Sequence, residues 1–465
     1  MSFGTLFFVF AFLPVGMILY YVTPKKLKNT VLLLISLLFF SWGTPEYLLL
    51  LLCSIAYHYF TGRQLFALRA KNRNGWARLV LTVSVLLDLL LLGFFKYWGF
   101  LAENLNALTG LSLRTTELPA PVGLSFFTFS LLSFLFDIYR DKAPEAKNPI
   151  DFALYVSFFP KLISGPIVPY GEMAQELRDR RITRQKLSEG ARLFLIGLAK
   201  KLLLADTLGT AFYALSAQTE LSVVGAWLGA VCYALMLYYD FGGYSDMAIG
   251  LASLCGFTIK RNFHYPYCAV SLTDFWRRWH ISLGAWFRDY VYIPLGGSRR
   301  GAGRTMLHLL TVWLLTGLWH GASWTFLLWG VYYGVLLILE KFVFCRILKK
   351  TPLILRRILT IFLVLIGWVF FFSPDLSSAF SWLGTMFGGS GAWIDDTARY
   401  QLLGIVRLLP AALLGAIPLP ALLGDRMLDR KGGQLAAFLY FALLLLLCIA
   451  CMMNETYSSF LYFQF

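Results

Sequence analysis

Residues 309–330 read LLTVWLLTGLWHGASWTFLLWG, a run of 22 residues without a single Asp, Glu, Lys or Arg. A helix of about 20 such residues is long enough to cross the hydrocarbon core of a bilayer. The same apolar character extends along the chain, since 58% of its 465 residues are hydrophobic and only 14% are charged. A globular domain carries about 25% charged residues, and disorder requires low hydrophobicity. The sequence therefore predicts an all-α polytopic membrane protein and excludes a set of soluble domains or a disordered chain.

Apolar runs of similar length recur and predict about 11 transmembrane helices within a single integral-membrane domain, 1–465. Three further segments are broken or too short to cross alone, namely 30–60, 150–172 and 244–257. Such segments persist at membrane depth only where protein or a water-filled cavity shields their backbone, so they indicate re-entrant helices around a pocket. The full-length spans are expected near 3–22, 79–100, 119–139, 187–213, 222–243, 305–325, 326–345, 352–373, 401–423 and 434–453.

The net charge of +16 has two explanations, a nucleic-acid partner or positively charged loops on one side of a bilayer. Seven loops hold 32 of the 41 Lys and Arg residues, namely 24–29, 60–78, 140–149, 178–186, 258–304, 346–357 and 425–431. The loops at 101–118, 214–221 and 374–400 hold only Arg114 and Arg399. Cytoplasmic loops of membrane proteins are enriched in Lys and Arg, so we assign the seven loops to the cytoplasm. This assignment predicts a multi-pass protein with both termini outside the cytoplasm and no nucleic-acid partner.

The longest cytoplasmic stretch, 258–304, is unlike a connecting loop and predicts a cytoplasmic or interfacial segment. We expect a helix over 274–290, with His280 beside Trp276 at the edge of its apolar side. An amphipathic helix of this kind lies in the membrane interface, with its charged face toward water or an anionic ligand. A plain lipid-headgroup anchor is the alternative. The apolar stripe is formed by Phe275, Trp279, Leu283, Trp286 and Tyr290, and the charged residues opposite or beside it are Arg277, Arg278, Arg288 and Asp289.

His320 is the single ionisable residue in 309–330. An ionisable group inside the membrane is costly to bury, which makes it a functional candidate. Apolar surroundings favour the uncharged imidazole, which is the form that a general base requires. Gly317 and Gly321 are four residues apart, a spacing that lets another helix or a ligand approach closely. The alternative is a histidine hydrogen-bonded between helices. One helix face is expected to carry a polar strip of Thr316, His320 and Ser323.

Other polar groups at membrane level are weaker candidates. The segment Asp240-Phe-Gly-Gly-Tyr-Ser-Asp246 places two carboxylates and Tyr244 in a glycine-rich break. Substrate binding competes there with capping of a broken helix or pairing with an arginine. Lys200 and Lys201 are expected to extend their amines to the membrane surface. The sequence has no Walker A motif, nucleophile elbow, HExxH or metal-spaced cysteine set, so we predict neither a metal nor a bound cofactor.

Five segments together are similar to the motifs of the membrane-bound O-acyltransferase family. They are Asp240–Gly250, Asn262-Phe-His-Tyr-Pro-Tyr267, Phe275–Tyr290, Tyr292-Ile-Pro-Leu-Gly-Gly297 and Gly317-Leu-Trp-His-Gly321. The likeness covers nearly the whole chain, with a core motif region at 118–345. It resembles most the bacterial branch that contains the alginate O-acetyltransferase membrane subunits, and more distantly the subunits that attach D-alanine to teichoic acid.

The resemblance implies a ring of helices around a central tunnel in the bacterial cytoplasmic membrane. The family's two histidines correspond to His320, at the end of a cytoplasmic funnel, and to His280. It also implies that acetyl-CoA, or another thioester, donates an acetyl group from the cytoplasm. An extracytoplasmic SGNH-type acetyltransferase, or a similar acceptor protein, would then esterify an exported polysaccharide. Candidates for binding donor or acceptor are Trp276, Arg277, Arg278, Trp279, Arg288, Asp289, Asp240, Tyr244, Asp246, Trp319 and Ser323.

Other functions remain open on the sequence. D-alanyl transfer to teichoic acid or acylation of a lipid would use the same scaffold. A carrier-protein requirement or a wider tunnel would distinguish these reactions from acetyl transfer. A proton-coupled transporter would use His320 as a relay, but the sequence shows neither inverted repeats nor ionisable pairs along a path. A non-catalytic scaffold of a secretion complex would tolerate replacement of both histidines.

Overall fold

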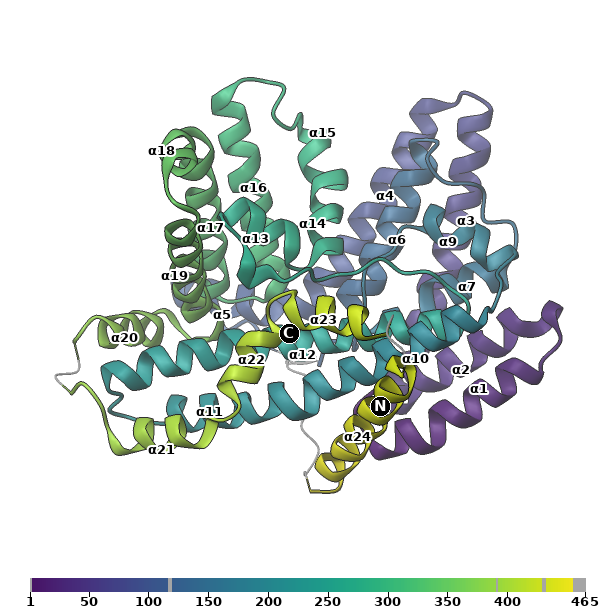
Figure 1. Ribbon diagram of the computed structural model, residues 1–465. Coiled ribbons are helices and arrows are strands. Elements are labelled where there is room, and N and C mark those ends of the chain that lie inside the picture. Colours follow the sequence, from purple (N-terminus) through teal and green to yellow (C-terminus); the bar gives the residue numbers. More distant parts are fainter. Residues whose placement is uncertain (1, 116–118, 390–391, 429–431, 455–465) are drawn as a thin grey trace. The chain divides into compact units, whose positions relative to one another are not determined.

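Figure 1 shows the chain as a computed structural model in which every regular element of the described part is a helix. The described part comprises residues 2–115, 119–389, 392–428 and 432–454. Six of its helical segments are long and apolar enough to cross a membrane. They are Lys25–Gly43, Asn74–Thr109, Val223–Leu254, Trp324–Phe342, Leu353–Phe372 and Gly433–Met453. The prediction of an all-α chain with several membrane crossings is confirmed.

The chain folds as two compact units, and unit 1 is formed by residues 1–194 and 246–260. The predicted break within 30–60 is present, because Pro45 begins a separate 3-10 turn ahead of the next helix. The segment 150–172 is likewise divided, and residues 163–169 are not helical. The helices of unit 1 are α1 (Leu13–Val22), α2 (Lys28–Gly43), α3 (Leu48–Ala70), α4 (Asn74–Leu92), α5 (Trp98–Thr109), α6 (Leu124–Tyr139), α7 (Pro149–Ser157), α8 (Phe159–Leu162) and α9 (Tyr170–Arg178).

Unit 2 is formed by the described residues within 195–245 and 261–454 and contains both candidate histidines. Two helices, α10 (Arg184–Ala199) and α12 (Val223–Leu254), contribute residues to both units. The other helices of unit 2 are α11 (Asp206–Ser216), α13 (Leu272–Arg278), α14 (Ile281–Phe287), α15 (Ile293–Leu295), α16 (Ala302–His320), α17 (Trp324–Phe342), α18 (Cys345–Lys350), α19 (Leu353–Phe372), α20 (Leu376–Met386), α21 (Asp396–Ile405), α22 (Leu409–Gly415), α23 (Leu419–Leu428) and α24 (Gly433–Asn454).

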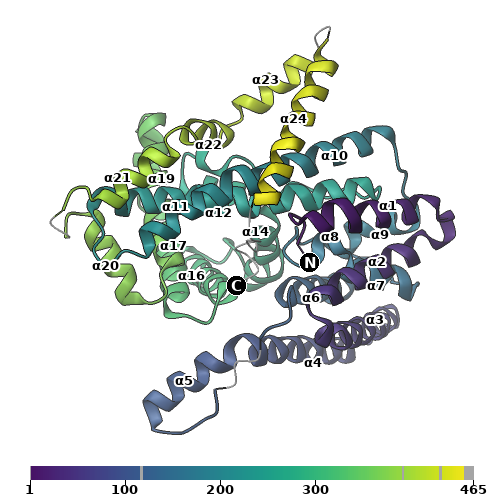
Figure 2. The same ribbon diagram turned by 90° about the horizontal axis from the view of Figure 1, so that it is seen from below.

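Helix α12 runs without interruption through 240–246, so the predicted glycine-rich break is wrong. Gly243 of this segment instead allows a close approach of α10, which lies alongside α12 (Figure 2). In unit 2, a Cβ atom added at Gly243 would lie 2.7 Å from the carbonyl oxygen of Gly197. A small residue is needed where two helix backbones approach this closely. The glycines at 242–243 thus accompany a helix–helix contact rather than a helix end.

The expected span at 401–423 is also wrong, because the structure divides this region among α21, α22 and α23. Pro410 lies in the first turn of α22, and the first turn of α23 follows Pro418. Proline has no backbone N–H to donate, so it is tolerated in the first turn of a helix but interrupts an interior. The apolar composition of 401–423 predicted one membrane span, but prolines interrupt the helix there and divide the region into short helices.

Candidate active site

His320 is the last residue of α16, in a tight hairpin with α17. A Cβ atom added at Gly317 would overlap the carbonyl oxygen of Phe326, and one added at Gly330 would lie 2.5 Å from the carbonyl oxygen of Trp313. Both contacts are with backbone, so neither position accepts a side chain without separating the helices. The predicted close approach at Gly317 is confirmed, and it packs the end of α16 directly against α17.

The imidazole of His320 lies in an aromatic environment and is only 5% exposed. Its ring centroid is 4.8 Å from that of Phe371 on α19 and 5.1 Å from that of Trp329 on α17. The polar strip predicted with Ser323 is wrong, because α16 ends at His320. Ser323 instead caps the following helix, where its hydroxyl accepts a hydrogen bond from the N–H of Thr325.

His280 lies at a break between two short helices, so the continuous helix predicted over 274–290 is wrong. Helix α13 ends at Arg278, and the backbone of His280 has the left-handed angles φ 46° and ψ 55°. A residue with a Cβ atom rarely adopts this conformation unless its surroundings enforce it. Three hydrogen bonds with the preceding segment enforce it here: Ile281 N–H to Asn262 O (2.9 Å), Ser282 N–H to Asn262 Oδ1 (3.0 Å) and His264 N–H to Arg278 O (2.9 Å).

The break turns the His280 imidazole into the protein, where it is 3% exposed. Its ring centroid lies 4.8 Å from that of Phe241 on α12. Burial lowers the pKa of His280 to about 3, so its imidazole is uncharged at neutral pH. Asn262, which enforces the turn through backbone and side-chain oxygens, was not singled out from the sequence. The available signal was the tendency of asparagine to hydrogen-bond nearby backbone in turns.

One tryptophan contacts both candidate histidines. The Trp319 ring lies 5.9 Å from the His280 ring and 4.7 Å from the His320 ring, between centroids. The interplanar angles are 72° and 73°, so both contacts are edge-to-face. The structure thus brings together the two histidines and Trp319 in one buried cluster. Spacing along the chain alone gave no measure of this proximity.

The aromatic cluster continues onto the candidate residue Trp276. Its ring centroid lies 4.7 Å from that of Tyr333, 4.8 Å from that of Trp313 and 5.5 Å from that of Trp329. Trp276 therefore docks α13 onto the α16–α17 hairpin. Trp279 is buried against Trp368 of α19, at 5.0 Å between centroids. Both tryptophans face the interior of unit 2.

The arginines predicted to form a basic face are partly neutralised by neighbouring carboxylates. Arg278 pairs with Asp274 (Nε to Oδ1, 2.8 Å), and Arg288 pairs with Asp289 (Nε to Oδ1, 2.7 Å). Arg277 is exposed. Of the three arginines, Arg277 is the one placed in solvent without a carboxylate in hydrogen-bonding range among the described residues.

The candidates of the 240–246 segment do not act as one group. Asp240 is 2% exposed and pairs with Lys201 (Oδ1 to Nζ, 2.9 Å), which also contacts Asp206 (2.6 Å). The expectation that Lys201 reaches the membrane surface is wrong, since its side chain is buried in this ion-pair cluster. Tyr244 is buried in unit 2, whereas Asp246 is half-buried and belongs to unit 1.

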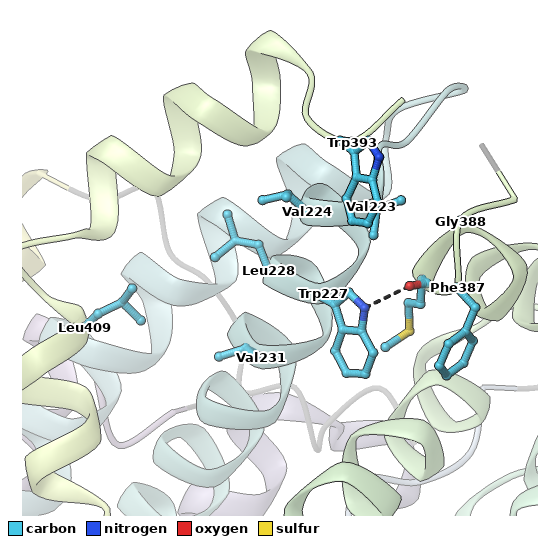
Figure 3. Close-up of a pocket in the computed structure, with 10 residues that line it drawn as sticks. Val223, Val224, Trp227, Leu228, Val231, Phe387, Gly388, Trp393 and Leu409 are labelled. Carbon is cyan, nitrogen blue, oxygen red and sulfur yellow. Dashed lines mark hydrogen bonds between the residues drawn. The ribbon is translucent and has the colours of Figure 1, made fainter. Parts of the chain in front are cut away.

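A separate cavity of about 600 Å³ lies between the first turns of α12 and the residues that follow α20 (Figure 3). Its lining is apolar, and the indole N–H of Trp227 donates a hydrogen bond to the carbonyl oxygen of Met386 (2.9 Å). Neither candidate histidine lines it. This cavity is therefore distinct from the histidine cluster.

Lowering the pH is expected to destabilise the protein through His280. An unfolded histidine takes up a proton near pH 6.5, whereas the folded residue does so near pH 3, so stability rises with pH between these values. The wild type should lose about 1.4 kcal/mol per pH unit below 6.5 from this residue. Thermal unfolding in detergent at pH 7.5, 6.5 and 5.5 measures the slope. His280→Gln should flatten it, and equal slopes for both proteins would contradict the expectation.

The membrane-bound O-acyltransferase family model matches residues 36–380 of the chain. The chain belongs to this family. It is therefore a membrane acyltransferase, and the resemblance inferred from the five motifs is confirmed.

The names of three relatives describe three different activities. The chain is 39% identical to the probable alginate O-acetylase AlgI of Pseudomonas syringae pv. tomato, over 87% of this chain and 79% of that protein. It is 36% identical to the peptidoglycan O-acetyltransferase of Helicobacter pylori, over 84% of this chain and 80% of that protein. It is 27% identical to the teichoic acid D-alanyltransferase of Bacillus subtilis, over 59% of this chain and 71% of that protein.

Proposed function

We propose that this acyltransferase moves an acetyl group from a cytoplasmic thioester, acetyl-CoA, to an acceptor on the other side of the membrane, for O-acetylation of an exported polysaccharide. Over the aligned residues, two relatives named as O-acetylating enzymes are 39% and 36% identical to the chain, against 27% for the named D-alanyltransferase. Alginate and peptidoglycan both carry sugar hydroxyls, so both relatives support a polysaccharide hydroxyl as the acceptor. The protein lies in the bacterial cytoplasmic membrane with both termini outside.

The observation that carries the proposal is the pair of buried histidines in contact with one tryptophan. His280 and His320 are 3% and 5% exposed, and each packs edge-to-face against Trp319. A site of this kind excludes bulk water, which would otherwise hydrolyse the thioester. An uncharged imidazole in such a site can accept a proton from a hydroxyl group.

The chemistry needs one base and no metal. His320 accepts the proton of the acceptor hydroxyl while its oxygen attacks the thioester carbonyl. The carbon–sulfur bond breaks, and the thiolate takes up the proton to leave as free CoA. Alternatively, the imidazole of His320 first accepts the acetyl group and then passes it to the hydroxyl. His280 orients the donor or assists the proton transfer.

Among the three candidate arginines near His280, Arg277 is the one that we assign to attract the phosphates of the donor. Its side chain is exposed, whereas Arg278 and Arg288 are each paired with a carboxylate. Trp276 and Trp279 then line the inner side of the same segment. An extracytoplasmic SGNH-type acetyltransferase, or a similar acceptor protein, completes delivery to the polymer.

The test is acyl transfer by the purified protein in nanodiscs. Acetyl-CoA labelled in the acetyl group is added with alginate or peptidoglycan fragments, with and without an SGNH-type acetyltransferase. We expect labelled ester on the fragments and an equal amount of free CoA. A parallel reaction supplies D-alanine on its carrier protein. Transfer from that carrier with none from acetyl-CoA would overturn the proposal in favour of D-alanylation.

A further inference from the structure

The start of α13, which leads to His280, is held by two charged residues from other helices. The N–H groups of Leu272 and Thr273 donate to the two carboxylate oxygens of Glu340, at 2.7 and 3.0 Å. The Nε–H of Arg356 donates to the carbonyl oxygen of Val270, at 3.2 Å. Glu340 belongs to α17, and Arg356 belongs to α19. The Glu340 carboxylate therefore accepts hydrogen bonds from N–H groups of this short segment, and the Arg356 guanidinium donates one to a carbonyl oxygen.

The carboxylate satisfies groups that a helix leaves open at its beginning. The first N–H groups of any helix lack a partner within it. Ser271, the N-cap of α13, accepts from the N–H of Asp274, at 3.1 Å. Glu340 accepts from the two N–H groups that remain. Its negative charge also lies at the positive end of the α13 dipole, which adds a favourable interaction.

The position of Glu340 within its own helix is locally unfavourable. It lies two residues before the C-terminus of α17, where the negative end of the helix dipole disfavours an acid. A sequence position that breaks a local rule is often explained by a role in tertiary structure. Here the contact with α13 supplies that role.

Helix α13 depends on such contacts, because its seven residues are too few to form a stable helix alone. Its C-terminal end is fixed by the hydrogen bonds around Asn262, and its middle docks through Trp276. Its beginning is fixed by Glu340 and Arg356. Helix α17 also carries Trp329, which contacts His320. The Glu340 contact therefore ties the segment that presents His280 to the hairpin that presents His320.

We propose that Glu340 and Arg356 are positioning residues that hold α13 in place and thereby set the location of His280 beside Trp319. Neither residue touches the histidines, so each acts through the backbone of residues 270–273. The effect on turnover rests on the proposed function. The effect on the location of His280 does not depend on it.

Diethyl pyrocarbonate, which modifies accessible imidazoles, provides the test in the full-length protein. His280 is buried and should be protected in the wild type, whereas His264 is exposed and reports the reagent dose. We expect Glu340→Ala and Arg356→Ala to raise His280 modification at least about tenfold by mass spectrometry of the peptide. Arg357→Ala, which removes the exposed arginine next in sequence, is the matched control and should leave His280 protected.

Three further readouts separate positioning from unfolding. His320 should stay protected in Glu340→Ala, because loss of the fold would expose both histidines together. Glu340→Gln keeps one carbonyl oxygen and should give an intermediate modification of His280. The kcat for acetyl transfer should fall about 10- to 100-fold in Glu340→Ala, less in Glu340→Gln, and less than about twofold in Arg357→Ala.

The proposal is overturned if His280 remains protected in both Glu340→Ala and Glu340→Gln. A wild type that transfers no acetyl group, with His280 exposed in Glu340→Ala, would remove the proposed function and leave the positioning role intact. Normal acetyl transfer by the wild type, with His280 still protected in Glu340→Ala, would leave the proposed function intact and remove the positioning role.

Discussion

Replacing His320 by alanine is expected to lower acetyl transfer by about 10²- to 10⁴-fold, the range that loss of a general base produces. The imidazole is the base of the proposed mechanism, and it is enclosed by Trp319, Trp329 and Phe371. His320 is only 5% exposed, so bulk water has little access to the imidazole. The initial rate of labelled ester formation in nanodiscs measures the effect.

His264 provides the matched control, because it is a histidine of the same unit but is exposed at the surface. His264→Ala should keep at least about half of the wild-type rate, since surface substitutions have small effects. Retention of more than a tenth of the rate in His320→Ala, with folding intact by thermal unfolding, would remove His320 from the chemical step. A relay in a transporter would instead show proton flux without ester formation.

Replacing Gly317 by alanine is expected to disrupt the α16–α17 hairpin. The new methyl group would overlap the carbonyl oxygen of Phe326 and approach the Cα of Gly330, and both neighbours are backbone atoms that cannot rotate away. Overpacking of this kind costs typically 1–3 kcal/mol, and a backbone clash lies at the upper end. His320 follows one turn later, so separation of the helices also moves the proposed base and lowers the rate.

Gly303 is the matched control for this substitution, because it lies on the same helix with no atom within 4 Å of an added Cβ. Gly303→Ala should leave activity unchanged and stabilise the protein slightly, by about 0.5–1 kcal/mol, through higher helix propensity. The midpoint of thermal unfolding and the initial rate of ester formation, measured for both variants, test this prediction. Equal midpoints for Gly317→Ala and Gly303→Ala would show that the hairpin can open at no cost.

The histidine cluster shows how far sequence reasoning reaches. His320 was identified because an isolated ionisable residue stands out in an apolar run, and Gly317 because small residues recur at helical spacing. His280 was predicted to lie within one continuous helix, because apolar residues recur there every three to four positions. The chain instead breaks at this residue. The break is enforced by hydrogen bonds that Asn262 accepts from Ile281 and Ser282, and such long-range partners leave no periodic signal.

The charged residues give the same lesson. Asp240 and Lys201 were both interpreted from their own surroundings. Asp240 was expected to bind substrate, to cap a broken helix or to pair with an arginine, and Lys201 was expected to reach the membrane surface. Each lies in an apolar helix, and neither sequence position identifies the other as its partner. The structure pairs them at 2.9 Å because α10 and α12 cross at Gly197 and Gly243. A buried charge needs a partner, but only the helix crossing determines which residue supplies it.

The amino-acid order by itself determined that the chain is helical, enters the membrane many times and carries an imidazole within an apolar helix. These properties follow from composition and local periodicity, which act over one or two helical turns. The tertiary structure alone decided that His280 turns inward, that Trp319 joins it to His320, and that Glu340 holds the start of α13. These contacts join helices far apart in the chain, and they form because buried N–H, carbonyl and charged groups must find partners wherever the fold brings them.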